Sequence, residues 1–123
     1  MIPSRPAALI VDDQPFLGLV ASEILRESGF ETFHAYDAAE ASAVLREHPE
    51  IEVVVTEAEL PGDVNGVDLC REVAWKRPEV QLVVTSSRAE PRDVPKGTRV
   101  LRKPYSSGEL RSLVAAKALL ADA

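Results

Sequence analysis

Side chains that can bind a cation or a phosphoryl group follow short apolar runs in this 123-residue chain. They are Asp12 and Asp13, Glu57, Thr85, and Lys103. Carboxylates are hard oxygen ligands of the kind that Mg²⁺ takes in proteins. A lysine beside such a cation can neutralise the negative charge that spreads over oxygens during phosphoryl transfer. These residue types are therefore typical of magnesium-dependent phosphoryl chemistry, provided that folding brings them together.

The apolar runs before these residues have the length of strands that are buried on both faces. They cover residues 7–11, 51–55, 82–84 and 100–101. Amphipathic stretches of helical length separate most of the runs, which predicts an α/β fold in which crossover helices join parallel strands. Since the carboxyl ends of parallel strands share one edge of a sheet, we expect the polar residues to converge there.

The stretch after the first run has the signals of a helix. Pro15 suits the first helical position, and Gly29 is placed to end the segment. Phe16, Val20 and Ile24 repeat every fourth residue. We therefore expect these three side chains to form the apolar face of the helix.

Three more helices are expected further along the chain. Capping-box pairs mark two of their starts, and these pairs are Asp37 with Glu40 and Ser106 with Glu109. The other helix runs from about residue 67 to residue 76, because Pro78 closes it. On this helix Cys70, the single cysteine, has the spacing of a core residue, and we expect Trp75 to be partly buried.

One crossover lacks these signals. Residues 87–97 include two prolines, Pro91 and Pro95, and a single large apolar residue, Val94. A proline costs about 3 kcal/mol in a helix interior. We therefore predict at most a turn or two of helix between the last two strands.

The composition is that of one compact acidic domain. Lysine and arginine number 14 against 20 aspartates and glutamates, a net charge of -6, which disfavours nucleic acid as a partner. The first residues lack the apolar core of a secretory signal, and no run approaches the roughly 20 apolar residues that span a bilayer. We expect a single domain over residues 1–123 that is cytoplasmic and has no membrane partner.

The order of the polar groups resembles that in the receiver domain of bacterial response regulators. An acidic pair follows the first strand, an acid precedes the turn Leu60-Pro61-Gly62, a threonine follows the fourth strand, and Lys103-Pro104 follows the fifth. The resemblance covers essentially the whole chain. It implies a doubly wound, flavodoxin-like parallel sheet of five strands in the order 2-1-3-4-5, flanked by five helices, of which the fourth is short or degraded here. It also implies a non-enzymatic domain in two-component signalling.

The resemblance assigns a role to each polar residue. Asp12 and Asp13 fall on the pair that helps to bind Mg²⁺. Glu57 takes the place of the aspartate that accepts a phosphoryl group from a histidine kinase. Thr85 falls on the hydroxyl residue that bonds to the phosphoryl oxygens, and Lys103 falls on the lysine that pairs with them.

The metal site implied by the resemblance comprises the carboxylates of Asp12, Asp13 and Glu57 and the backbone carbonyl of Glu59. The Lys103-Pro104 peptide bond is expected to be cis. The expected partners are a histidine kinase or phosphotransfer protein, a separate effector protein, or a second copy in a homodimer. With no output domain within residues 1–123, the signal is expected to pass by protein contact.

Glu57 differs from an aspartate by one methylene group, which moves the carboxylate by roughly 1.5 Å. A misplacement of about 1 Å can lower a rate a hundredfold, so we expect inefficient phosphorylation. The longer side chain can instead reach toward Lys103 and Thr85 and imitate the activated state in part. The alternative is that Glu57 is an inert ion-pair partner. Val100 stands where the family has a Tyr or Phe that turns inward on activation.

Three functions stay open on the sequence. The first is a stand-alone receiver in a phosphorelay, in which Glu57 prevents or mimics phosphorylation. The second is a pseudo-receiver that docks its partner whatever the phosphorylation state, which Val100 and the degraded crossover favour. The third is a magnesium-dependent phosphatase of the haloacid-dehalogenase type. That class needs Asp-x-Asp, whereas Gln14 follows Asp12 and Asp13.

Overall fold

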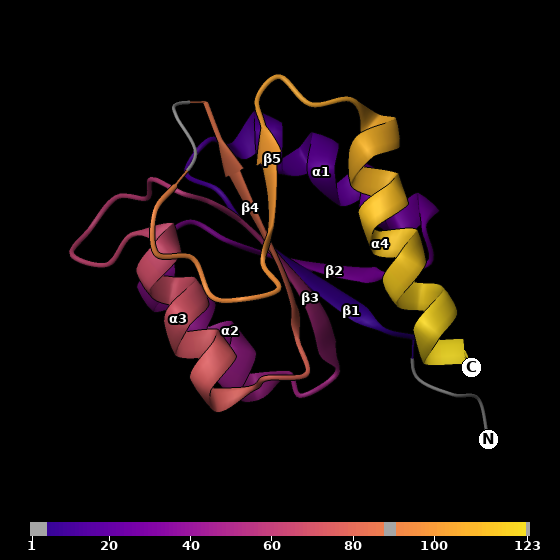
Figure 1. Ribbon diagram of the computed structural model, residues 1–123, viewed down its shortest axis with the longest axis horizontal. Coiled ribbons are helices and arrows are strands. Elements are labelled where there is room, and N and C mark those ends of the chain that lie inside the picture. The colour runs from indigo at the N-terminus through magenta and orange to yellow at the C-terminus, as the bar shows by residue number, and fades with distance from the viewer. Residues whose placement is uncertain (1–4, 88–90, 123) are drawn as a thin grey trace.

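The computed structural model describes residues 5–87 and 91–122, with the burial of side chains described as far as residue 114. Its elements are, in chain order, β1 (Ala7–Val11), α1 (Pro15–Glu27), β2 (Glu31–Ala35), α2 (Ala38–Glu47), β3 (Ile51–Glu57), α3 (Gly66–Lys76), β4 (Gln81–Ser86), β5 (Arg99–Arg102) and α4 (Ser107–Asp122). Strands and helices alternate as far as β4 (Figure 1). This alternation confirms the predicted α/β architecture.

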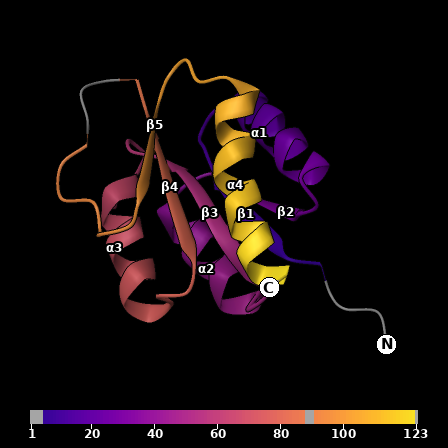
Figure 2. The ribbon, with the colours of Figure 1, turned by 45° about the vertical axis from the view of Figure 1, so that its right-hand side comes forward.

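The strands form one parallel sheet in the order β2-β1-β3-β4-β5, which confirms the doubly wound topology. The helices α1 and α4 cover one face of the sheet, and α2 and α3 cover the other (Figure 2). Four helices lie within the described residues, one fewer than in the family pattern, because none of these residues forms a helix between β4 and β5. None of the described helices is long and apolar enough to cross a membrane.

The strand β1, which lies between β2 and β3, is buried on both faces, and this explains its unbroken apolar run. Leu9 and Val11 lie in the core beneath α2 and α3, whereas Ala8 and Ile10 lie in the core beneath α1 and α4. Burying a side chain of this size contributes about 1.5–3 kcal/mol. Because β1 packs into both cores, the residues that follow it lie at a rigid edge of the sheet.

The predicted helix ends are confirmed. Pro15 is the first residue of α1, and Gly29 follows its end with a φ of 98°. In α2 the Asp37 side chain accepts a hydrogen bond from the backbone N–H of Glu40 at 2.9 Å. At the start of α4 the capping box is reciprocal, since Ser106 and Glu109 each accept from the other's backbone N–H.

The buried face of α1 differs from the predicted one. Phe16 is 75% exposed and Val20 is 45% exposed, so only Ile24 of the expected stripe is buried. The helix packs instead through a set rich in small residues, namely Gly18, Ala21, Ser22, Ile24 and Leu25. A Cβ atom at Gly18 would lie 2.7 Å from Nε2 of His34 in β2 and would displace the imidazole. The close approach of helix and strand, rather than hydrophobicity alone, determines which face of α1 is buried.

The two predictions for α3 have opposite outcomes. Cys70 is fully buried, as expected, and burial raises the pKa of its thiol to about 12. Trp75 is 86% exposed, so the expectation that it is partly buried was wrong. It lies two residues beyond the buried Val73, which at 3.6 residues per turn is the opposite side of the helix.

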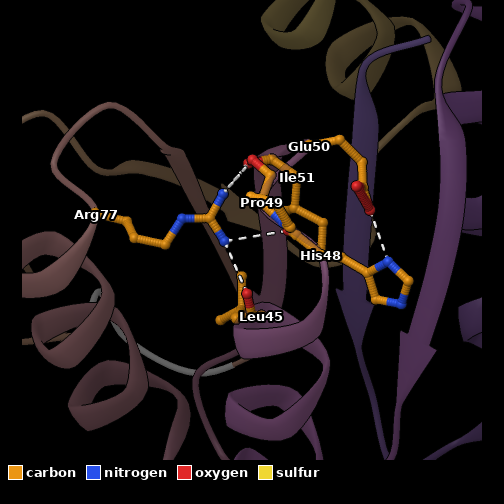
Figure 3. Close-up of polar contacts among 6 residues, drawn as sticks. All are labelled: Leu45, His48, Pro49, Glu50, Ile51 and Arg77. Carbon is orange, nitrogen blue, oxygen red and sulfur yellow. Dashed lines mark hydrogen bonds and ion pairs between the residues drawn. The ribbon is translucent and has the colours of Figure 1, made fainter. Parts of the chain in front are cut away.

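Arg77, just after α3, ties that helix to the end of α2 and the start of β3 (Figure 3). Its Nη1 atom donates to the carbonyl oxygens of Leu45 at 3.1 Å and His48 at 3.3 Å. Its Nη2 atom donates to those of Pro49 and Ile51, both at 2.8 Å. The guanidinium thus bonds to one carbonyl of the last turn of α2 and to three carbonyls of the chain that leads from α2 into β3.

The connection from β4 to β5 is irregular. Residues 91–98 form no helix, which confirms the prediction for this part, and residues 88–90 lie outside the described residues. Val94 packs against the core beneath α2 and α3. Arg71 Nη1 donates to the carbonyl oxygen of Asp93 at 3.4 Å, which fixes the connection to α3. The connection leads into β5, the strand at the sheet edge.

Candidate functional site

The carboxyl ends of β1 and β3 bring three carboxylates together. Asp12 and Asp13 follow β1, and Glu57 is the last residue of β3. One oxygen of each side chain lies within 4.8 Å of the other two. Asp12 is buried, and Asp13 and Glu57 are half-buried. The expected convergence of these residues is therefore present in the fold.

Two further residues predicted from the sequence come from β4 and from the chain after β5. Thr85 is buried and is the register partner of Glu57 on the neighbouring strand. Lys103 is held by its backbone N–H, which donates to the carbonyl oxygen of Ser86 at 2.8 Å. Its peptide bond to Pro104 is cis, as the resemblance implied. The Nζ atom of Lys103 donates to Oε1 of Glu57, and the two form an ion pair.

The electrostatics around Glu57 are mixed. Burial raises the pKa of Glu57 above the ordinary value of 4.5, and Asp13 and Asp12 add to the rise, whereas Lys103 opposes it. The same field reaches the phenol of Tyr105, whose pKa is raised by burial first and then by Asp12 and Glu57. Burial thus keeps the pKa of Glu57 above its ordinary value although Lys103 forms an ion pair with it.

The acidic pair is held by its own backbone. Asp12 is 7% exposed, and its Oδ1 atom accepts a hydrogen bond from the backbone N–H of Gln14 at 2.7 Å. This bond fixes one carboxylate oxygen and leaves the other available. Pro15 then starts α1 directly, so the turn between β1 and α1 has little freedom to move the pair.

A cavity of about 330 Å³ opens beside Glu57. Its walls come from the turns after β1, β3 and β4, and the residues are Asp13, Gln14, Glu57, Ala58, Glu59, Leu60, Pro61, Thr85, Ser86 and Ser87. The wall includes Glu59, whose carbonyl oxygen the resemblance offered to the cation. That role of Glu59 stays a prediction.

Gly66 is a residue of the site that sequence reasoning missed. It is the first residue of α3, and its backbone N–H donates to the carbonyl oxygen of Ala58 at 2.9 Å. A Cβ atom at this position would lie 1.7 Å from the carbonyl oxygen of Glu57, so α3 can start here only with glycine. The available signal was the cap residue Asn65, whose side chain accepts from the N–H of Asp68 at 2.9 Å.

The donor set fits a hard divalent cation. Mg²⁺ takes carboxylate oxygens in octahedral geometry and usually keeps several waters. Asp12, Asp13 and Glu57 offer oxygens at a common point, from two adjacent strands of the sheet. Two carboxylates about 4 Å apart repel by roughly 4 kcal/mol at an effective dielectric of 20, and a bound cation would offset this repulsion.

The fold and the site together define a signalling domain. The family model of the response regulator receiver domain matches residues 8–115. This chain belongs to the response regulator receiver domain family, whose members act in two-component signalling and bind Mg²⁺ at an acidic pocket.

Known proteins of this family resemble the chain over most of its length. The DNA-binding response regulator MtrA of Mycolicibacterium smegmatis is 32% identical over 119 residues, which are 92% of this chain and 50% of the relative. The chain thus spans about half the length of this relative. A CheY-like receiver from Methanospirillum hungatei has a TM-score of 0.82 at 24% identity, over 93% of this chain and 94% of its own. A receiver from Sinorhizobium medicae has a TM-score of 0.79 at 26% identity, over 93% of both chains.

Proposed function

We propose that Glu57 fixes this receiver domain in one signalling state. In that state the glutamate, rather than a phosphoryl group, is the ionic partner of Lys103. The observation that supports the proposal is the ion pair between Lys103 Nζ and Glu57 Oε1. The family uses the lysine at this position to pair with the phosphoryl oxygens. Here the lysine already has an anionic partner within the chain.

The imitation is incomplete for a physical reason. A carboxylate has one charge and two oxygens, whereas a phosphoryl group has about two charges and three oxygens. Glu57 can therefore engage Lys103 but leaves fewer oxygens for Thr85. Val100 stands where the family has the aromatic residue that turns inward, so the change that follows activation has no ring to move.

Phosphorylation of Glu57 itself is inefficient under this proposal. The added methylene displaces the carboxylate by roughly 1.5 Å relative to an aspartate, and in-line attack tolerates little misplacement. Asp12, Asp13 and Glu57, with the backbone carbonyl of Glu59, would still hold Mg²⁺, which would neutralise the carboxylates.

The signal passes by protein contact, and the domain itself is no enzyme. The partners we propose are those of the family, namely a histidine kinase or phosphotransfer protein and a separate effector. A second copy of the chain, in a homodimer, is a further proposed partner. A phosphatase role is not supported by the residues, since Gln14 stands where that class needs its second aspartate.

The second candidate function is a docking module that ignores the site. It is favoured by Val100 and by the irregular connection of residues 91–98, which replaces a helix that the family uses in signalling. The two candidates differ in one respect. Binding to the effector depends on the charge of Glu57 in the first and does not in the second.

The deciding experiment is intact-mass spectrometry after incubation with Mg²⁺ and acetyl phosphate, with the chain and Glu57→Asp side by side. An adduct on the aspartate variant alone is expected, and it would show a competent pocket whose nucleophile has been replaced. An adduct of similar yield on the unsubstituted chain would overturn the proposal. Adducts on neither protein would favour the docking module.

A further inference from the structure

The sheet edge at β5 has a charge opposite to that of the rest of the chain. Residues 91–103 contain five of the 14 lysines and arginines but only one of the 20 aspartates and glutamates. Four of these cations are exposed, and we call them the basic edge: Arg92, Lys96, Arg99 and Arg102. No side chain of the basic edge has a hydrogen bond or ion pair with another described residue.

The backbone of β5 is open on its outer side. Within the described residues β5 pairs only with β4, and it is the last strand of the sheet. None of the described residues outside β4 forms a backbone hydrogen bond with residues 99–102. Figure 2 shows β5 at the outer edge of the sheet, between α3 and α4. An outer edge of this kind presents N–H and C=O groups that an added strand can pair with.

The side chains of β5 put one arginine on each face of this edge. Leu101 belongs to the core beneath α1 and α4, so Arg99, two residues earlier, lies on the same face. Arg102 shares the opposite face with the half-buried Val100. A strand added here would therefore meet an arginine above and below its plane, with an apolar side chain between them.

The positive charge of the basic edge determines which kind of segment can bind beside β5. Two copies of β5 laid edge to edge would bring their arginines close together, and like charges across a strand pair are destabilising. An extended segment rich in aspartate or glutamate would instead meet a cation on each face. Peptides of this kind bind by strand addition, in which main-chain bonds supply affinity and side chains supply specificity.

We propose that β5 binds an extended acidic segment of another protein by strand addition. β5 has four residues, so the main-chain pairing covers about 13 Å. The segment needs an acidic residue on each face and an apolar residue between them. This inference concerns a surface away from Glu57 and does not rest on the function proposed above.

The test uses a blocked, fluorescent peptide with the repeat Glu-Val-Val-Glu, which puts a glutamate on each face of a strand and is about twice the length of β5. Fluorescence anisotropy measures its affinity, and NMR shifts of the protein's amides locate it. We expect binding with shifts centred on residues 99–102. A matched peptide that is N-methylated at every residue has the same charge but offers no backbone donor on either edge, and it should bind at least about tenfold more weakly.

Variants separate strand addition from charge alone. Arg99→Glu/Arg102→Glu should lose binding of the acidic peptide and gain binding of a matched peptide in which lysine replaces each glutamate. The milder Arg99→Gln/Arg102→Gln should also weaken binding of the acidic peptide, and it serves where the charge reversal does not fold. Glu23→Gln, which neutralises an exposed carboxylate on α1, should bind the acidic peptide as the unsubstituted chain does. Equal affinity for the N-methylated peptide, or shifts centred outside β5 and the basic edge, would overturn the proposal, as would unchanged binding by the glutamine pair.

Discussion

At the C-terminal end of β3, the Glu57 carboxylate has the ammonium group of Lys103 beside it and the acidic pair after β1 close by. Burial is the largest cause of its raised pKa, and the attraction of Lys103 does not reverse the rise. The folded protein therefore keeps a proton on Glu57 more readily than the unfolded chain does. A difference of this kind links folding to pH.

The free energy of unfolding of the unsubstituted chain should fall as pH rises through the pKa of Glu57, and we expect Glu57→Gln to abolish this fall. A raised acid pKa contributes stability that is fully present below the ordinary value of 4.5 and is lost as pH rises through the folded-state pKa. The free energy of unfolding of the variant, minus that of the unsubstituted chain, should therefore grow with pH from 4.5 and then level off. Urea unfolding at a series of pH values measures this difference.

The control for this prediction is Glu23→Gln, which neutralises an exposed carboxylate on α1. The free energy of unfolding of this variant, minus that of the unsubstituted chain, should stay nearly constant over the same pH range. A constant difference for Glu57→Gln as well would contradict the assignment of a raised pKa to this residue.

At the scale of elements, the C-terminal end of α2 is held by a side chain from the residue that follows α3. The guanidinium of Arg77 meets four carbonyl groups from the end of α2 and the start of β3. We expect Arg77→Ala to lower the free energy of unfolding by about 3 kcal/mol, because hydrogen bonds to a charged group are each worth roughly 1.5–3 kcal/mol and several are shared by one group. Arg46→Ala, at an exposed position, should change it by less than about 0.5 kcal/mol.

Urea unfolding compares these two variants directly. Arg77→Lys should recover only part of the loss, since an ammonium group cannot reach all four carbonyls as the planar fork does. Losses of equal size for Arg77→Ala and Arg46→Ala would show that the carbonyl contacts add nothing to stability.

The start of α3 depends on another close contact between elements. We expect Gly66→Ala to destabilise the fold by about 3 kcal/mol, because the new Cβ atom would lie 1.7 Å from the carbonyl oxygen of Glu57 and must push α3 away from β3. Gly108→Ala is the matched control in α4, where the nearest atom lies at 3.7 Å and alanine is the better helix former. Thermal unfolding should show a lower melting temperature for Gly66→Ala and an unchanged or higher one for Gly108→Ala. An unchanged melting temperature for Gly66→Ala would contradict the close contact.

For the whole molecule, the carboxylate cluster exists only when β1 and β3 lie side by side. A cation that binds the folded chain alone therefore stabilises it, by about 2.7 kcal/mol at a hundred times its dissociation constant. We expect Mg²⁺ to raise the melting temperature of the unsubstituted chain and of Asp63→Asn, which changes an exposed acid in the turn before α3. Asp13→Asn should lose most of this rise.

Differential scanning calorimetry in a series of Mg²⁺ concentrations measures the effect. An equal rise in Asp13→Asn and Asp63→Asn would mean that the cation acts on the general negative charge of the molecule. In that case, the carboxylates after β1 and β3 would not form a site.

Local patterns predicted the elements and the ends of the helices. The apolar runs predicted four of the strands, because a strand that is buried on both faces shows in the chain as an unbroken run. Capping pairs such as Asp37 with Glu40 placed helix starts correctly, since each pair bonds to its own backbone. The convergence of Asp12, Asp13 and Glu57 followed from strand direction alone.

Contacts between distant segments were not predictable in this way. Phe16 and Trp75 are exposed, against expectation, because the face that a helix buries depends on how closely its neighbours approach. The carbonyl contacts of Arg77 and the space that Gly66 must leave join residues far apart in the chain. No periodicity in the sequence reports such a pair.

The sequence by itself therefore determined the strands of the sheet and the polar edge at their carboxyl ends. These features depend on residue type and on short-range pattern. The tertiary structure alone decided that Arg77 meets the carbonyl groups around the end of α2 and that β5 presents its arginines at an open edge. Both depend on where the chain returns after a long separation, and only packing in three dimensions sets that position.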